Sequence, residues 1–437
     1  MLTTDSSVPP GRGRNLVLCC DGTSNQFGRK NTNVVRLLQC LCRNPAEQMI
    51  YYDPGVGTLP QPNRVSRLAK WWSKTTGLAF GTGLTADVLE GYAYLMQQWA
   101  PSDQVFIFGF SRGAYTARVL AGLLHTFGLL PRGAHNLLPY VIRYFRALSD
   151  RENRDQMPEL EKTYVEFRRT FARAIDGATD GERQFKAHFL GLWDTVSSVG
   201  WIWDPKSFRH TAFNPSVRFA RHAIAIDERR VFFRQNRLAP QPSTTHALGT
   251  DAQTGLQKVI ECWFAGSHCD IGGGHEIADD KLWPITLDWM LREAENVGLS
   301  VDQTRKAAIF GDRLSGQIWK EEQHESISGF WRAAEYFPTI RRRKNYETGE
   351  WQARLEIGRG KPRRIRSGEL IHKTVLQRLR ESEVNLPHGK RGAYDPPSLC
   401  SVYKENVRNM TAELPEMHRY VAADCGCGAC QRLASDG

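Results

Sequence analysis

A glycine–serine–glycine turn between an apolar strand and a small-residue helix is the feature that most constrains the fold of this chain. The segment VFIFGFSRGAYTAR occupies residues 105–118, and its first residues are β-branched and aromatic, as in a buried strand. From Ala114 onward, small and apolar residues recur at helical spacing. Between the two lies a G-x-S-x-G pattern, with Gly109 and Gly113 on either side of Ser111. A turn this sharp leaves no room for a β-carbon beside the serine, so the pattern predicts a nucleophile elbow rather than a helix-capping serine.

Strand and helix patterns alternate through the first 300 residues. Apolar runs that stop in polar and glycine residues are NLVLCCDGT, MIYYDPGVGT, QVFIFGF, KAHFLGLWDTVSSVG and KVIECWFAGSHCDIGGG. Helical patterns separate them, among them TNVVRLLQCLC, LTADVLEGYAYLMQQWA and WPITLDWMLREAENVGL. This alternation predicts an α/β fold with a mainly parallel sheet and helices on both faces. In such a sheet the ligand site lies beyond the carboxyl ends of the strands.

Two segments depart from the alternation. Residues 134–182 are charged and helical without a strand between them, which indicates a helical insertion in a catalytic core of residues 14–300. Residues 301–437 are richer in arginine, lysine and turn residues. We expect them to form a C-terminal cap or lid region without clear sheet content.

The composition limits where the chain acts. Of its 437 residues, 41% are hydrophobic and 24% are charged, which is enough for a large core in a soluble protein. The N-terminal stretch MLTTDSSVPPGRGRN lacks the apolar centre of a secretory signal, and no run approaches the ~20 apolar residues that span a bilayer. We therefore expect a cytoplasmic protein, although export without a signal would leave no mark in the sequence.

The formal net charge of +11 is concentrated in two basic runs, RRRK at 341–344 and RGKPRRIR at 359–366. Such runs either form a solvated face or contact the phosphates of an anionic membrane or a nucleic acid. No zinc-finger spacing, recognition helix or RNA-binding aromatic motif accompanies them, so we expect no nucleic-acid partner. Peripheral contact with an anionic membrane stays open.

Ten cysteines in a chain of this length do not indicate a disulfide framework. The tail DCGCGACQR holds Cys425, Cys427 and Cys430, which could bind zinc if His418 supplied a fourth ligand. The spacing is not a paired C-x-x-C arrangement, and we expect neither a metal nor another cofactor.

A serine nucleophile needs a histidine base that is oriented by a carboxylate, and in α/β-hydrolases the chain order is serine, acid, histidine. Asp194 follows the apolar strand HFLGLW, and His268 follows VIECWFAGS, so both lie at strand ends in the correct order. The pattern predicts a triad of Ser111, Asp194 and His268. We interpret Asp270, two residues after His268, as a carboxylate that stabilises the turn.

The oxyanion of such a reaction needs two backbone amides. One is expected from Arg112, directly after the nucleophile, and the other from Gly22 or Thr23 in the loop CCDGTSN after the first strand. The DGT in this loop also ends a phosphatase signature. That signature requires an aspartate nucleophile two residues before Asp21, where this chain has Cys19, so the phosphatase interpretation fails.

These motifs together resemble a known family. LVLCCDGTSN, YYDPGVGT, GFSRGAYTARVLAGLL, GLWDTVSSVG and CWFAGSHCDIGGG are similar to an uncharacterised α/β-hydrolase family that includes phospholipase effectors of bacterial type VI secretion. IHKTVLQR and YDPPSL, at 371–378 and 394–399, also resemble its C-terminal segment. The resemblance implies an α/β-hydrolase fold and a catalytic triad of Ser111, Asp194 and His268.

The sequence thus predicts a serine hydrolase that cleaves a carboxylic ester, either a small molecule or a lipid. Two alternatives from other classes remain. In one, His268, Asp270 and His275 bind a divalent metal together with Asp21 and hydrolyse phosphoesters. In the other, the chain is a binding module without catalysis that uses its basic C-terminal region.

Overall fold

The structure is a computed structural model that describes residues 13–22, 28, 30–55, 83–175, 185–196, 208–212, 214–238, 249–276, 279–314, 316–344, 351–421 and 427.

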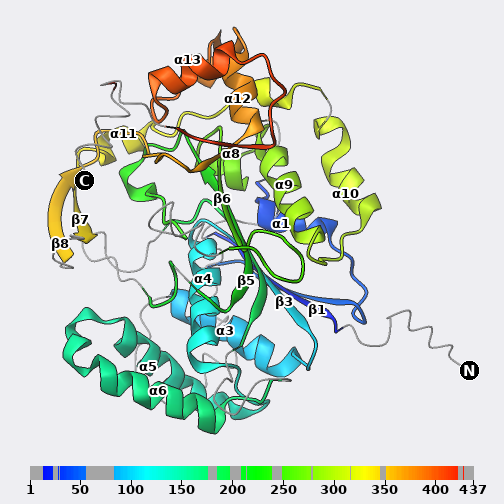
Figure 1. The fold of residues 1–437 in the computed structure, drawn as a ribbon, viewed down its shortest axis with the longest axis vertical. Helices are drawn as coiled ribbons and strands as arrows, with labels where there is room; N and C mark the ends of the chain where they lie inside the picture. Colours follow the sequence, from blue (N-terminus) through cyan, green and yellow to red (C-terminus); the bar gives the residue numbers. More distant parts are fainter. Residues whose placement is uncertain are drawn as a thin grey trace, which may run out of the picture.

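The centre of the molecule is one eight-stranded sheet (Figure 1). Its strands follow the order β12-β9-β6-β5-β4-β3-β1-β2, and all neighbours are parallel except β12, which runs antiparallel to β9. The bounds are β1 Asn15–Cys20, β2 Gln48–Asp53, β3 Gln104–Phe110, β4 Ala187–Trp193, β5 Val217–Ala225, β6 Val259–Phe264, β9 Leu370–His372 and β12 Met417–Arg419. The predicted α/β-hydrolase-like class, with a mainly parallel sheet, is confirmed.

Helices cover both faces of the sheet because successive strand residues point to opposite sides. Leu16 and Leu18 of β1 pack in one hydrophobic cluster with α3 (Gly83–Gln98) and α4 (Arg112–Phe127). Val17 and Cys19 pack in a second cluster on the other face. The helices of that face are α1 (Asn33–Cys40), α9 (Trp283–Glu295) and α10 (Gln303–Phe310) (Figure 1).

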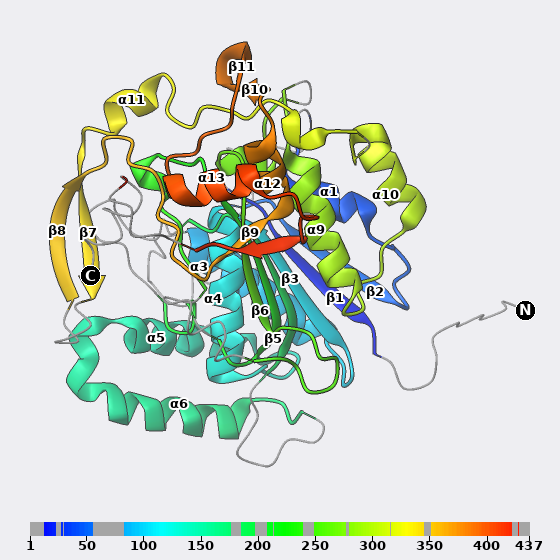
Figure 2. The ribbon, with the colours of Figure 1, turned by 45° about the horizontal axis from the view of Figure 1, so that its top comes forward.

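The predicted helical insertion at about 134–182 contains α5 (Leu138–Ser149) and α6 (Met157–Phe171), preceded by the short 3₁₀ helices η1 (Ala134–Leu137) and η2 (Arg151–Gln156) respectively. The two long helices lie side by side at one end of the molecule in both views (Figures 1 and 2). Phe145 of α5 and Phe167 of α6 each contact Phe127 of α4, so the insertion packs on the helix that follows the glycine–serine turn.

The C-terminal region differs from the expectation of a cap without sheet content. β9 pairs with β6, and β12 pairs with β9, so residues far beyond 300 extend the central sheet. The hydrogen-bonded edge of β6 accounts for this, since pairing satisfies backbone groups that burial would otherwise leave without partners. The division of the chain into two domains at residue 300 stays a prediction.

The other elements of the C-terminal region lie around one end of the sheet and beside it (Figure 2). The helices α12 and α13 pack with β9 in a third hydrophobic cluster. A separate hairpin of β7 and β8 stands at the side, next to α11 (Figures 1 and 2). The bounds of these C-terminal elements are η4 Gly311–Leu314, η5 Ile318–Lys320, α11 Phe330–Ala334, β7 Pro338–Lys344, β8 Trp351–Ile357, α12 Lys373–Arg380, β10 Val384–Leu386, η6 Pro387–Gly389, β11 Lys390–Gly392 and α13 Ser401–Asn409. Two short helices lie earlier in the chain, η3 Val231–Phe233 and α8 His268–Gly272.

Among the described helices, none has both the length and the apolar character needed to cross a lipid bilayer.

The strand order contains a topological switch point. The chain passes from β1 to β2 on one side and then returns to β3 on the other side of β1. The connections after β1 and β3 therefore diverge, and in open α/β sheets the crevice at such a point is where ligands bind. The turn at Ser111 begins there, at the carboxyl end of β3.

Candidate active site

Ser111 sits alone between a strand and a helix. β3 ends at Phe110 and α4 begins at Arg112, and the backbone of Ser111 takes a positive φ of 59° with ψ of −121°. A β-carbon on Gly109 would lie 2.5 Å from the carbonyl oxygen of Gly113, and one on Gly113 would lie 2.2 Å from that of Cys20. Both contacts are with backbone atoms, which cannot rotate away. The two glycines are therefore what allows the chain to turn this sharply beside β1.

His268 joins Ser111 to Asp194. The His268 Nε2 atom lies 2.8 Å from Ser111 Oγ, and its Nδ1 atom lies 2.6 Å from Asp194 Oδ2. Asp194 directly follows β4, and His268 begins the short helix α8 after β6, so three separate strand ends bring the side chains together. All three side chains are buried, and Asp194 has no exposed surface. In the neutral tautomer that fits these contacts, Nδ1–H donates to the carboxylate and Nε2 accepts from the serine hydroxyl.

A fourth side chain, Arg363, binds Asp194 from the C-terminal region. Its NH1 and NH2 groups donate to Asp194 Oδ1 and Oδ2, at 2.5 and 3.0 Å. Burial alone would raise the pKa of Asp194, but the charge of Arg363 and the hydrogen bond from His268 outweigh it and hold that pKa well below its usual range. The sequence placed Arg363 in a basic run with a solvated or membrane-facing role, and this is wrong, because Arg363 is only 6% exposed.

Aromatic rings hold the imidazole of His268 between them. The ring of Phe110 lies 4.7 Å from it and that of Phe233 lies 4.9 Å from it, centroid to centroid. Phe233 in turn contacts Trp331 of α11 and lies under the guanidinium of Arg230. These contacts fix the plane of the imidazole and exclude water from it.

Glu228 connects Arg230, which covers the Phe233 ring, to the backbone of His268. It accepts hydrogen bonds from the backbone amide of His268 at 3.2 Å and from the Arg230 guanidinium at 2.7 and 2.9 Å. Glu228 is fully buried. Burial would raise its pKa, but Arg230 more than offsets this and lowers the pKa of Glu228 below its ordinary value. The carboxylate thus remains charged at the start of α8.

The predicted oxyanion donors differ in their positions. The amide of Arg112 lies in the first turn of α4, where backbone N–H groups lack acceptors within the helix. The amide of Gly22 instead donates to Asp21 Oδ1 at 2.7 Å. Asp21 also accepts from Thr32 and Tyr52, which fixes the loop after β1. Thr23 lies outside the described residues, and the two oxyanion donors stay predictions.

Of the four residues in the predicted metal site, Asp270 and His275 lie close together, whereas His268 and Asp21 are engaged elsewhere. His268 uses its two ring nitrogens on Ser111 and Asp194, and Asp21 serves the β1 loop. Asp270 accepts from the Ser267 backbone and side chain, as the turn-stabilising carboxylate that the sequence predicts.

Among the described residues, His324 joins Asp270 and His275 in one cluster of possible metal ligands. Ligand atoms of Asp270, His275 and His324 lie within 4.8 Å of one another. The Asp270 Oδ1 atom in this set is already bonded to His324 Nδ1 at 2.6 Å, and burial lowers the pKa of His275 to about 4. His324 had no sequence pattern that could have identified it.

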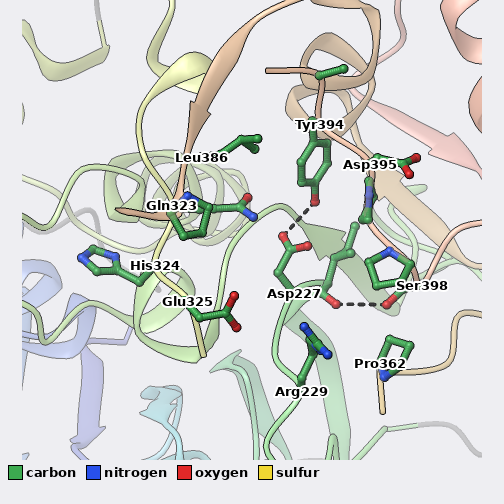
Figure 3. A pocket seen from close by; sticks show the side chains of 15 residues that line it. Asp227, Arg229, Gln323, His324, Glu325, Pro362, Leu386, Tyr394, Asp395 and Ser398 are labelled. Atoms are coloured by element: carbon green, nitrogen blue, oxygen red, sulfur yellow. Dashed lines mark hydrogen bonds between the residues drawn. The ribbon is translucent and has the colours of Figure 1, made fainter. Parts of the chain in front are cut away.

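A cavity of about 280 Å³ lies behind the site, between the end of β5 and the C-terminal segment (Figure 3). Asp227, Arg229 and Tyr394 point into it, and Pro362, directly before Arg363, forms part of its wall. Burial raises the pKa of Asp227 to about 6, and its Oδ2 atom accepts from the Tyr394 hydroxyl at 2.8 Å. The cavity is lined by none of the three residues Ser111, Asp194 and His268.

The cysteine tail falls largely outside the described residues, since Cys425 and Cys430 are not described. Cys427 packs against the C-terminal hydrophobic cluster. His418 shares a 3.0 Å hydrogen bond between its Nδ1 atom and the Tyr403 hydroxyl. The zinc site at this tail stays an untested alternative.

A curated relative, an uncharacterised protein of Saccharomyces cerevisiae, is 32% identical over 248 residues. The match covers 54% of this chain but only 35% of the yeast protein.

Two solved structures are similar at low identity. An uncharacterised protein from Pseudomonas aeruginosa has 17% identity and a TM-score of 0.38, over 66% of this chain and 46% of the other. The Tle1 effector bound to the VgrG spike of the type 6 secretion system has 18% identity and a TM-score of 0.30, over 61% and 52%.

A sequence model described as "T6SS, Phospholipase effector Tle1-like, catalytic domain" matches residues 14–293. This range is more than half of the chain and includes Ser111, Asp194 and His268. The chain therefore belongs to the family of Tle1-like phospholipase effectors of type VI secretion, through their catalytic domain.

Proposed function

We propose that this protein is a serine hydrolase that cleaves carboxylic esters of lipids. The observation that carries the proposal is the unbroken series of hydrogen bonds from Ser111 through His268 to Asp194, at a strained turn in a chain of a phospholipase family. A serine hydroxyl is a weak nucleophile, and an adjacent base that is itself oriented by a carboxylate is the arrangement that activates it.

In this proposal each residue has a role that its contacts support. Ser111 Oγ attacks the acyl carbon while its proton passes to His268 Nε2, and the carbonyl electrons move onto oxygen, to which the Arg112 amide donates. Collapse of this intermediate breaks the ester C–O bond, and His268 returns the proton to the leaving alkoxide. Water then hydrolyses the acyl-serine by the same two proton transfers. Asp194 holds the imidazole in its tautomer and stabilises the imidazolium.

Covalent labelling tests this assignment. A fluorophosphonate should modify the protein at Ser111, and Ser111→Ala should abolish both labelling and ester hydrolysis while the melting temperature changes little. His268→Ala should lose a comparable factor in kcat, since the three residues act as a unit. Activity that is lost to chelators, without labelling, would instead support the metal-dependent phosphoesterase. Retention of more than a few per cent of activity in Ser111→Ala would refute the nucleophile.

A lipid aggregate is the substrate that the surface beside this site favours. Half of the large apolar side chains that are exposed in the described chain lie where α11 meets the β7–β8 hairpin, namely Tyr336, Phe337, Leu355 and Ile357. Trp331 of α11 contacts Phe233, which contacts His268. The basic run 341–344 forms the end of β7 in the same hairpin. Exposed apolar residues beside basic ones suit the surface of an anionic bilayer. Each basic residue near such a surface contributes about 1 kcal/mol to the free energy of binding.

Vesicle assays separate this surface from the chemistry. Replacement of Arg341, Arg342, Arg343 and Lys344 by glutamine should lower hydrolysis of anionic vesicles about tenfold or more and leave a short-chain soluble ester unaffected. The matched control removes four exposed charges in the insertion and directly before it, at Arg132, Arg143, Lys162 and Arg169, which are distant in sequence from the hairpin. Raised salt should reproduce the loss on vesicles. Equal losses on both substrates would show that the hairpin supports folding instead.

A further inference from the structure

We infer that Arg363 is a positioning residue of the hydrolytic site, which keeps Asp194 ionised and holds its carboxylate in the plane that His268 requires. The inference rests on the proposed serine hydrolysis but adds a member that the triad pattern does not contain. Arg363 also lies outside residues 14–293, the range matched to the catalytic domain of the family.

The geometry is a two-point clamp. The two terminal nitrogens of Arg363 donate to the two oxygens of Asp194, and a planar guanidinium bound in this way fixes the plane of the carboxylate. Each oxygen has one further partner, the amide of Ala225 on Oδ1 and the ring of His268 on Oδ2. Rotation of the carboxylate would break bonds on both oxygens, so a single oxygen faces the imidazole.

The electrostatics give the same result. Asp194 has no exposed surface, and burial without a cation favours a neutral carboxyl. A neutral Asp194 would not stabilise the imidazolium that forms when His268 takes the serine proton. Arg363 is the full positive charge that binds this carboxylate, and it keeps the pKa of Asp194 well below its usual range.

Arg363 also joins the carboxylate to the walls of the site. NH1 donates to the carbonyl of Ala225 at the end of β5, and NH2 donates to the carbonyl of Phe233. The Phe233 ring contacts the His268 imidazole. One guanidinium therefore sets the positions of both the acid and the aromatic wall that orient the base.

A purely structural role for Arg363, the neutralisation of a buried aspartate, predicts something different. It predicts that variants lose stability and that the folded fraction keeps its kcat and its pH dependence. The positioning role predicts a lower kcat per folded molecule and an altered pH profile.

The test uses the full chain with Arg363→Met, Arg363→Lys and a control, Arg359→Gln. Arg359 lies in the same basic run but is exposed, and its backbone amide donates to the carbonyl of Glu335. For Arg363→Met we expect kcat on a soluble ester to fall about 10- to 1,000-fold with KM nearly unchanged, below the ~10⁴-fold cost of losing the triad carboxylate itself. Arg363→Lys should recover part of kcat, because lysine restores the positive charge but not the planar pair of donors that binds both oxygens of Asp194. Arg359→Gln should match the unmodified protein.

The pH profile provides the readout that a structural role does not move. Removal of the guanidinium makes protonation of Asp194 easier, and a protonated Asp194 does not stabilise the imidazolium, so the acidic limb of kcat/KM should shift to higher pH in Arg363→Met. In Arg363→Ala, guanidinium at tens of millimolar should restore part of the activity, and equimolar sodium chloride should not.

Failure of this inference and failure of the proposed function give distinct results. If the unmodified protein does not label at Ser111, the serine hydrolysis itself is wrong. If it does label, and folded Arg363→Met keeps the kcat and the acidic limb of the unmodified protein, Arg363 is structural only. If Arg363→Met does not fold, a folded Arg363→Lys with unaltered kcat and pH profile overturns the inference equally.

Discussion

At the scale of single residues, Asp194 determines most of the site. It is buried, its backbone has a positive φ of 37°, and its two oxygens bind Arg363, His268 and the amide of Ala225. That Ser111, Asp194 and His268 come together was predictable from chain order and strand ends alone. Arg363 was not, because nothing in RGKPRRIR distinguishes one arginine from its neighbour until the fold turns one of them inward.

Asp194→Asn should therefore damage stability as well as activity. The amide leaves the Arg363 charge buried without its partner, and breaking a buried pair in this way costs about 3–5 kcal/mol. Loss of kcat should approach ~10⁴-fold, since an amide favours the wrong tautomer of the histidine. Urea unfolding and ester hydrolysis measure the two effects.

The double variant Asp194→Asn/Arg363→Met separates them. It should regain part of the lost free energy of unfolding, because no unpaired buried charge remains, while kcat stays low. Strictly additive losses of stability in this cycle would contradict the buried ion pair.

At the scale of elements, the turn between β3 and α4 depends on a close approach to β1. The sequence predicted this turn because strand, glycines and helix stand in a fixed local order. It did not predict that β9 and β12 join the sheet, because strands of three residues carry too little periodicity to be seen. Their pairing is decided by the edge of β6, which is distant in sequence.

Gly113→Ala tests the close approach. The new β-carbon would lie 2.2 Å from the Cys20 oxygen and 2.4 Å from the Asp21 oxygen, so either β1 or the turn must move. We expect a lower melting temperature, a loss of stability of about 1–3 kcal/mol or more, and a steep loss of kcat.

Gly91→Ala is its matched control within α3. Its β-carbon would meet only side-chain atoms, of Leu120 at 3.2 Å and of Leu18 at 3.6 Å, and alanine favours the helix by about 1 kcal/mol. Activity should be retained and stability should change little. Equal damage in both variants would mean that the turn is not specially constrained.

At the scale of the whole molecule, buried histidines make stability depend on pH. His372 lies between β9 and α12, stacked on Phe264, with its Nδ1 atom accepting from the Thr374 amide. Burial lowers its pKa from about 6.5 to about 3, helped by the nearby charges of Lys373 and Arg292. The unfolded chain takes up this proton below pH 6.5 and the folded chain does not. The stabilising contribution is therefore complete above pH 6.5 and is lost as the pH falls toward 3.

His372→Asn should flatten that dependence, because asparagine can still cap the helix but does not titrate. Melting temperatures of the variant and the unmodified protein, taken from pH 7 to pH 3, should converge as the pH falls. The control variant His388→Gln replaces an exposed histidine and should leave the slope of melting temperature against pH unchanged. If the two curves of melting temperature against pH ran parallel, the His372 imidazole of the unmodified protein would take up its proton equally in the folded and the unfolded state.

The position of Arg363 in the chain also has a consequence for synthesis. A ribosome makes the protein from its N-terminus at ~5–20 residues per second, so the arginine emerges roughly 5 to 20 s after His268. During that interval Ser111, Asp194 and His268 exist without the cation that holds the acid in place. A nascent chain stalled near residue 300 should therefore react poorly with a fluorophosphonate, whereas a stalled chain with all 437 residues outside the tunnel should react fully. On the proposed role of Arg363, the hydrolytic site therefore stays inactive beside the membranes of the cell that makes it until the segment that carries Arg363 has left the ribosome.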